Sequence, residues 1–130
     1  LHERELLHAP LISAEQLCAG LKSAADHLDQ MSDRAGLPRD AFDVLLTNGE
    51  LLGVLHRSGT LASRRVAGRL EVEQVLGDDL GSIARSQSAE KTRCTVVAGP
   101  LAELPPNWQQ LPQRSVIALS RTEEPTVVAL

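Results

Sequence analysis

The sequence predicts an α+β domain in which mostly antiparallel strands pack against at least one helix. The first observation is a run of apolar residues at helical spacing over Ser13–Ala35. The second is a pair of apolar runs joined by Asn48-Gly49, and the third is a set of short apolar runs between Cys94 and Leu130. A helix followed by groups of short strands is typical of an antiparallel sheet covered by helices.

The helix is predicted over Ser13–Ala35. Ser13 and Gln16 form a capping-box pattern, in which each side chain bonds a backbone amide that the helix leaves unpaired. Gly36 suits a left-handed residue after the helix, and Pro38 prevents its continuation. One face of the helix is apolar at intervals of three and four residues: Leu17, Leu21, Ala24, Ala25, Leu28 and Met31.

A β-hairpin is predicted over Ala41–Arg57. Apolar side chains share one face of the first run (Phe42, Val44 and Leu46). Asn48-Gly49 follows at once, and Glu50–Leu55 is a second apolar run. Asn-Gly between two such runs favours a type I′ turn, because that turn requires positive φ at both central residues.

The middle of the chain is less regular. After a turn at residues 58–60, Leu61–Leu70 is rich in arginine (Arg64, Arg65 and Arg69). We expect this basic cluster to be a solvated face or a set of partners for carboxylates, with anion or substrate binding as the alternative. Leu70–Arg85 predicts one short or broken helix, since Gly77 and Gly81 interrupt its apolar pattern. Ser86–Lys91 reads as a polar loop.

The last third of the chain predicts three strands. Cys94–Ala98 is a short buried strand ended by Gly99-Pro100. Four prolines from residue 100 to residue 112 surround Trp108 and predict a fixed, irregular connection, with Trp108 packed at the edge of the core. The remaining elements are a hairpin of two strands and its loop: Val116–Leu119, Arg121–Pro125 and Thr126–Leu130.

Composition excludes several classes of function. With 42% hydrophobic and 23% charged residues, the 130 residues suit a single globular domain or half-domain. A net charge of −4 with only two lysines argues against a nucleic-acid partner and against membrane association. Phe42 and Trp108 are the only aromatic residues, so a base-stacking surface is not expected. No run approaches the roughly 20 apolar residues of a membrane span.

The sequence predicts no complete active site. It has no Gly-rich phosphate loop, no HExxH motif, no paired CxxC and no recognisable Ser/His/Asp set. Cys18 and Cys94 are expected to stay reduced in a cytoplasmic protein, and Cys18, beside the apolar face of the helix, is expected to be inert. His2 and His8 lack a third ligand at helical spacing. We therefore assign no catalytic, cofactor-binding or metal-ligating residue, and we expect no cofactor.

Two separated stretches together resemble class II glutamine amidotransferase-like proteins. Phe42–Arg57, with DVLLTNGELLGVLHR, resembles that family's segment lltDG..l.a.R. Thr95–Leu119, TVVAGPLAELPPNWQQLPQRSVIAL, resembles its vvaSEPL strand, Trp-containing loop and vP.gsll.v strand. The helix at Ser13–Ala35 lies where the family has one, so the resemblance covers the chain from about residue 12 to residue 130. The small stand-alone members, including the γ-glutamyl hydrolase of ergothioneine biosynthesis, are the most similar.

The resemblance implies a four-layer αββα sandwich of the N-terminal-nucleophile hydrolase type. Family members hydrolyse glutamine or γ-glutamyl amides with an N-terminal Cys, whose α-amino group is the base. An Arg, an Asn-Gly oxyanion pair and an Asp bind the substrate, and all of these lie in the family's first half. This chain begins at Leu1 and resembles only the second half. We therefore expect a partner, either an N-terminal amidotransferase segment or another protein chain, in a homo- or hetero-oligomer.

The chain departs from the family pattern at two places. Asn48-Gly49 replaces Asp-Gly, and both pairs suit a turn. Gly99-Pro100 replaces Ser-Glu-Pro and so loses a carboxylate. A competing alignment would make Asn48-Gly49 the oxyanion pair itself. The apolar strand that follows at Leu51–Arg57, with no acidic site after it, favours the turn.

A second hypothesis is a non-catalytic interaction or dimerisation module of the roadblock-like α+β type. The order of helix, hairpin, helix and sheet is similar to that of such modules. They end in a helix, whereas Thr126–Leu130 predicts a strand, which favours the amidotransferase-like hypothesis.

Overall fold

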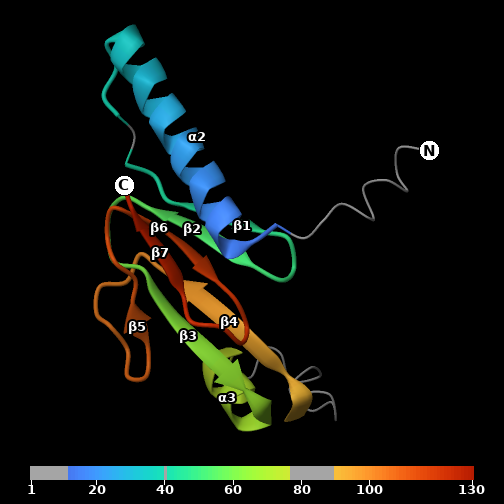
Figure 1. The fold of residues 1–130 in the computed structure, drawn as a ribbon. Helices are drawn as coiled ribbons and strands as arrows, with labels where there is room; N and C mark the ends of the chain where they lie inside the picture. Colours follow the sequence, from blue (N-terminus) through green and yellow to red (C-terminus); the bar gives the residue numbers. More distant parts are fainter. Residues whose placement is uncertain (1–11, 40, 77–89) are drawn as a thin grey trace, which may run out of the picture.

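The computed structural model describes residues 12–39, 41–76 and 90–130 (Figure 1). Every strand pair in these ranges is antiparallel, which confirms the α+β prediction. The elements in chain order are α2 (Ala14–Ala35), β1 (Val44–Thr47), β2 (Leu52–His56), β3 (Ala62–Ala67), α3 (Gly68–Leu76), β4 (Arg93–Ala98), β5 (Gln109–Gln110), β6 (Ser115–Leu119) and β7 (Thr126–Ala129).

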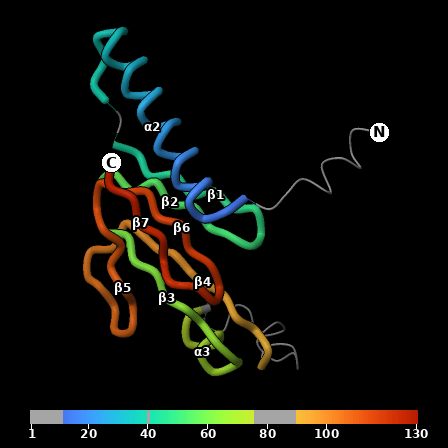
Figure 2. Tube along the Cα trace, in the orientation of Figure 1, coloured from blue at the N-terminus to red at the C-terminus, as the bar shows by residue number. Residues whose placement is uncertain are grey.

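The strands form two sheets. The order in the larger sheet is β1-β2-β6-β7, and the order in the smaller one is β4-β3-β5. At the centre of the larger sheet, β2 pairs with β6 from Leu52 opposite Leu119 to His56 opposite Ser115. The trace in Figure 2 leaves this sheet after β2, forms the smaller sheet and returns as β6 and β7.

Helix α2 covers one face of the larger sheet. Its buried residues pack with one face of β2 and β6 in a single cluster: Leu17, Cys18, Leu21, Ala25, Leu55, Val116 and Ala118. Gly53 permits this approach, because a Cβ at residue 53 would lie 2.7 Å from Leu21 Cδ1 and 3.1 Å from Leu17 Cδ2. The helix therefore packs directly on the backbone of β2.

The opposite face of the larger sheet packs against the smaller sheet. This second cluster contains Val54, Leu61, Leu111, Ile117 and Leu119, and half-buried Val97 of β4 packs against it. Ser63 of β3 is paired with Val97, so the next residue, Arg64, points away from the larger sheet. Arg64 donates to Gln74 of α3, which places α3 behind the smaller sheet. The layers therefore run α2, larger sheet, smaller sheet, α3.

The predicted boundaries of the long helix are confirmed, but only part of its predicted apolar face is buried. Ser13 and Gln16 form the capping box, and Gly36 has φ 66° at the C-terminal end. Leu28 and Met31, which we expected in the core, are 43% and 63% exposed. Ala24 is exposed as well. The helix extends beyond the sheet, so its last turns have no strand beneath them (Figure 1).

The hairpin is confirmed, but its predicted type I′ turn is wrong. Thr47 pairs with Leu52, which leaves a four-residue loop at 48–51. In this loop Gly49 has φ 92°, whereas Asn48 is not among the described residues with positive φ. The Asn48 side-chain oxygen instead accepts hydrogen bonds from the amides of Glu50 and Leu51. The Asn side chain thus closes the loop together with a backbone bond from the Asn48 amide to the Leu51 carbonyl oxygen at 3.3 Å.

The interpretation of Leu61–Leu70 as an arginine-rich face missed strand β3. Arg65 and Arg69 do have carboxylate partners, since they form ion pairs with Glu124 and Glu73. Helix α3 confirms the predicted short helix and begins at Gly68, two residues before the predicted start. Residues 77–89, which include Gly77, Gly81 and most of the predicted polar loop, lie outside the described residues, as do His2 and His8.

The predictions for the C-terminal third are confirmed with one addition. Strand β4 and the β6–β7 hairpin form where we expected them. The proline-rich connection contains the two-residue strand β5, which pairs with β3, and Trp108 is half-buried beside it. None of the described helices has the length and apolarity needed to cross a bilayer.

We predict that Gly99→Ala destabilises the fold, by about 1–3 kcal/mol for overpacking of this kind. A Cβ at residue 99 would lie 2.3 Å from Leu61 Cδ2 and 2.8 Å from the Thr60 carbonyl oxygen. Gly20→Ala is the matched control, because the space around Gly20 in α2 is open and alanine should stabilise the helix by about 0.5–1 kcal/mol. Urea unfolding of both variants measures this, and equal stability of the two would refute the prediction.

Candidate functional site: an open sheet edge and its polar neighbours

Strand β1 forms one edge of the larger sheet and is apolar on both faces. Leu46 is paired with Gly53, whose position beneath α2 places Leu46 on the helix side of the sheet. Leu45 is paired with Val54, which belongs to the cluster between the sheets, so Leu45 is on the opposite side. Leu45 and Leu46 are 55% and 52% exposed. Neither layer of the described chain extends far enough to cover them.

The two edges of the larger sheet differ. At the β7 edge, α2 reaches the strand, since Lys22 Nζ donates to the Ala129 carbonyl oxygen at 2.6 Å. Cys18 Sγ lies 3.8 Å from the Thr126 carbonyl oxygen. On their outer sides β1 and β7 both lack a strand neighbour in the described chain, but no contact from α2 reaches β1 in this way. Exposed edge strands are normally protected by charges, prolines or bulges, and the VLLT sequence of β1 has none of these.

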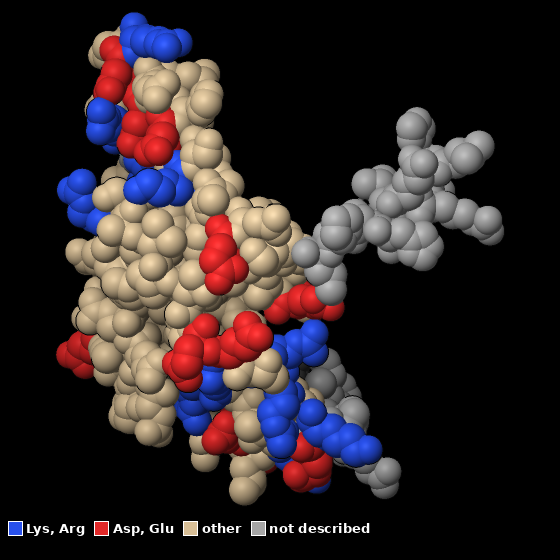
Figure 3. Space-filling model, viewed as in Figure 1, with Lys and Arg blue, Asp and Glu red and all other residues tan. Residues whose placement is uncertain are grey.

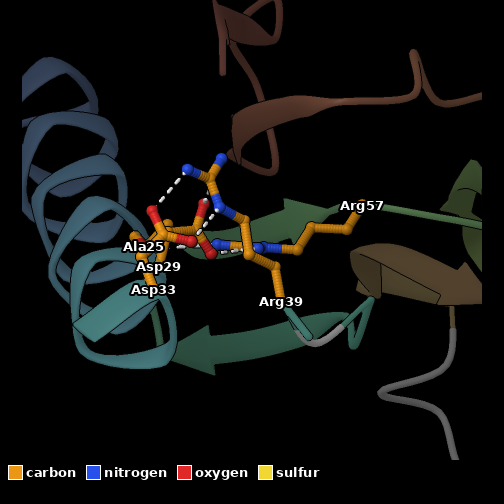
Figure 4. Close-up of polar contacts among 5 residues, drawn as sticks. All are labelled: Ala25, Asp29, Asp33, Arg39 and Arg57. Atoms are coloured by element: carbon orange, nitrogen blue, oxygen red, sulfur yellow. Dashed lines mark hydrogen bonds and ion pairs between the residues drawn. The ribbon is translucent and has the colours of Figure 1, made fainter. Parts of the chain in front are cut away.

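Arg57 joins α2 to the end of β2 just beyond this edge (Figure 4). Its Nη1 donates to Asp29 Oδ1 at 2.7 Å, and its Nη2 donates to the Ala25 carbonyl oxygen at 3.3 Å. The Arg57 side chain is only 12% exposed, and its guanidinium lies 5.7 Å from the centre of the Phe42 ring. Because Asp29 and the helix carbonyl bind its two Nη groups, we assign Arg57 a role in packing the helix.

Arg39 extends the same cluster towards the solvent. Its Nε and Nη2 donate to the two carboxylate oxygens of Asp33, at 3.0 and 2.7 Å (Figure 4). The hydrogen bond from Arg39 lowers the pKa of the Asp33 carboxyl, and the same bond raises the pKa of Arg39. A cavity of about 310 Å³ is lined by Arg39, Arg57 and Arg114, among others. Arg39 and Arg57 are both paired with aspartates, so the cluster is mainly structural.

Asp43 and His56 form a second pair, at the start of β1 and the end of β2. His56 Nδ1 donates to Asp43 Oδ1 at 3.1 Å, and the Arg57 amide donates to the same oxygen at 2.7 Å. His56 is fully buried, and its Nε2 has no hydrogen-bond partner in the described chain. An Asp–His pair can orient a general base. No described nucleophile is hydrogen-bonded to Nε2.

The backbone of the Asn48-Gly49 loop is used within the loop itself. Gly49 N donates to Thr47 Oγ1 at 3.0 Å, while the Asn48 oxygen accepts the two amides that follow it. An oxyanion hole needs donors directed at a vacant position. These contacts support the turn over the oxyanion interpretation of Asn48-Gly49.

The two thiols lie in different environments. Burial raises the pKa of the Cys18 thiol and the charge of Glu15 raises it further, while the hydrogen bond with the backbone of Ala118 offsets only part of this. Cys18 is fully buried and Cys94 is half-buried on β4. Within the described ranges, no group of three His, Cys, Asp or Glu residues could hold a metal ion.

Sequence reasoning could not find these contacts. Asp29 and Arg57, and likewise Asp43 and His56, come from different elements, and no spacing rule links them. The only available signal was the position of Arg57 at the end of the first family-like stretch. No protein-family model matches the chain, and no curated protein or solved structure matches it either.

We predict that Asp29→Asn destabilises the protein by about 2 kcal/mol, because it leaves the buried Arg57 guanidinium without its carboxylate. Asp33→Asn is the matched control on the same helix, since its bond to Arg39 is exposed and should matter little. Chemical unfolding of the two variants measures the difference. A loss of similar size in both would show that Arg57 does not depend on Asp29.

A second prediction concerns acid stability. Burial would raise the pKa of the Asp43 carboxyl, but hydrogen bonds from Arg57, His56 and Ser58 outweigh it, so the pKa is lowered from 3.8. The stability this provides is complete above the pKa of the unfolded chain and is lost as the pH falls through the folded-state pKa. Asp43→Asn should therefore be less stable at pH 7 and show a flatter decline below about pH 4. Parallel stability–pH curves for variant and wild type would contradict this.

Proposed function

We propose that this chain is the C-terminal portion of a class II glutamine amidotransferase-like amidohydrolase and supplies scaffold and one wall of the site. The observation that carries the proposal is the β1 edge, which exposes Leu45 and Leu46 on opposite faces. A strand that is apolar on both faces is typical of the interior of a layered fold. Such a strand requires a further strand beside it and further layers above and below it.

The arrangement of the layers supports the same proposal. The observed order of helix, two sheets and helix is the order that the family resemblance implies. The two stretches that carry the resemblance, Phe42–Arg57 and Thr95–Leu119, are hydrogen-bonded neighbours through β2 and β6. Stretches more than 30 residues apart therefore meet in one sheet, as parts of one structural unit should.

The exposed C-terminal part of α2 indicates which surface the proposed N-terminal segment covers. Leu28 and Met31 continue the apolar face of the helix beyond the last strand that α2 covers. In the proposed complete protein, the N-terminal segment adds to the sheet at β1 and covers these residues. That segment carries the Cys nucleophile and the residues that bind the substrate, since no described residue fills those roles.

The chemistry of the completed enzyme would be acyl transfer. The N-terminal thiol attacks the side-chain amide carbon of glutamine or of a γ-glutamyl compound, with the α-amino group accepting the thiol proton. The C–N bond breaks, ammonia or an amine leaves with that proton, and a thioester remains. Water then hydrolyses the thioester to the free acid and regenerates the thiol. The chain described here holds the geometry of the site and performs none of these steps.

The test begins with the native polypeptide, by intact mass and N-terminal sequencing together with the reading frame that encodes it. We expect a Cys-first segment, in the same polypeptide or in a co-purifying one, and release of ammonia or amine from glutamine or γ-glutamyl amides. Alkylation of thiols should abolish activity in a protein whose Cys18 and Cys94 have been changed to Ser. Activity that survives alkylation there, or a native protein without a Cys-first segment, would refute the proposal.

We also predict that Leu45→Lys weakens the association of this chain with the N-terminal segment, because it places a charge on the open edge. Leu70→Lys is the matched control, since Leu70 is 75% exposed on α3 and far from β1 in the fold. Co-purification of the two segments, produced as separate chains, measures the association. Equal losses in the two variants would show that β1 is not the joining edge.

A further inference from the structure

An open hollow of about 480 Å³ lies where the two sheets meet, at the end formed by the β1–β2 loop, the start of β4 and the end of β6. Its lining combines three leucines (Leu51, Leu52 and Leu119) with two arginines (Arg93 and Arg121). This hollow is separate from the cavity beside Arg57, since the two have no lining residue in common. Of the polar side-chain contacts described above, only those within the β1–β2 loop involve residues that line it.

The two arginines of the hollow are held by main-chain carbonyl oxygens. Arg93 Nη1 donates to the carbonyl of Thr92 at 2.9 Å and, more weakly, to that of Glu90 at 3.4 Å. Arg121 Nη2 donates to the Gly49 carbonyl at 3.1 Å. Neither guanidinium forms an ion pair with a carboxylate of the described chain. The carbonyls orient both groups without cancelling their charge, and each retains further N–H donors.

The other wall of the hollow is apolar. Leu119 is 4% exposed within the cluster between the sheets, and half-buried Leu52 packs against that cluster. Leu51 is half-buried against the α2 cluster. A ligand that fills this space would bury a short hydrocarbon part while its charged end meets the arginines. Ligand sites commonly combine an apolar wall with a few fixed polar groups in this way.

The charge balance limits the ligand further. Glu50 also lines the hollow and forms no ion pair in the described chain, so two positive charges stand against one negative charge. The net charge of one suits a monoanion better than a phosphate dianion. A neighbouring hollow of about 690 Å³ shares Glu50, Arg93 and Arg121 and adds Lys91 together with Glu15 and Glu123. Figure 3 shows basic side chains gathered at this end of the molecule beneath a row of acidic ones.

We infer that this hollow binds the carboxylate of a small organic acid that carries a short apolar chain. Arg93 and Arg121 hold the carboxylate, for which the planar guanidinium is well matched, and the three leucines contact the chain. This inference goes beyond the proposed amidohydrolase function, because it requires only residues of this chain. It also holds if the protein is no enzyme.

Titration calorimetry of the chain tests the inference, with hexanoate as the probe and hexylammonium and inorganic phosphate as comparisons at equal ionic strength. We expect saturable binding of hexanoate, none of hexylammonium and weaker binding of phosphate. Arg93→Ala and Arg121→Ala should each weaken hexanoate binding by on the order of tenfold, the loss typical of one charged hydrogen bond. Arg69→Ala, which removes an arginine of α3 paired with Glu73, should bind like the wild type.

Two further variants sharpen the test. Arg121→Lys keeps the charge and should retain part of the affinity, which separates loss of the ligand contact from loss of the fold. Glu50→Gln should tighten hexanoate binding several-fold and strengthen phosphate binding, since it removes the negative charge. Three results would each overturn the inference: no binding of hexanoate, unchanged binding in both alanine variants, or phosphate binding at least as tight as hexanoate in the wild type.

Discussion

The antiparallel pairing of β2 with β6 is the constraint on which the rest of the fold depends. Each strand contributes to both hydrophobic clusters, since Leu55 and Val116 face α2 while Val54 and Ile117 face the smaller sheet. A slip of one residue would turn each side chain to the opposite face. It would also move Gly53 from beneath α2, where a side chain has little room. The register of this one pair thus positions the helix and the second sheet together.

The same sheet is contacted by α2 at one edge strand and left open at the other. At β7, contacts from α2 reach the last strand, whereas β1 presents leucines on both faces and the described chain offers nothing to cover them. The polar groups near β1, in contrast, are bonded to one another within the chain. Asp43 bonds Nδ1 of His56 and Asp29 bonds Nη1 of Arg57, so these pairs tie together the hairpin and the helix.

Sequence patterns predicted the elements whose cause is local. The cap at Ser13, the end at Gly36 and the β1–β2 hairpin all follow from side chains a few residues apart. Strand β3 was missed because Arg64 and Arg65 are adjacent and stand among small residues. Such a sequence suggests a charged segment rather than a strand. The turn at Asn48 was misassigned because its side chain, rather than its φ angle, closes the loop. The exposure of Leu28 and Met31 depends on where the sheet ends, and the pairing of Arg57 with Asp29 depends on packing between elements. Neither is encoded in a local pattern.

The long interval between β2 and β6 also has a consequence for the order in which the protein folds. Helix α2 contains its own hydrogen bonds and can form within about a microsecond. Its buried face, however, needs Val116 and Ala118, which lie some 90 residues further along the chain. At roughly 5–20 residues per second, a ribosome would add residues 57–114 in about 3–12 seconds after β2. For that interval during synthesis, α2 and the β1–β2 hairpin lack the strand that completes their shared cluster.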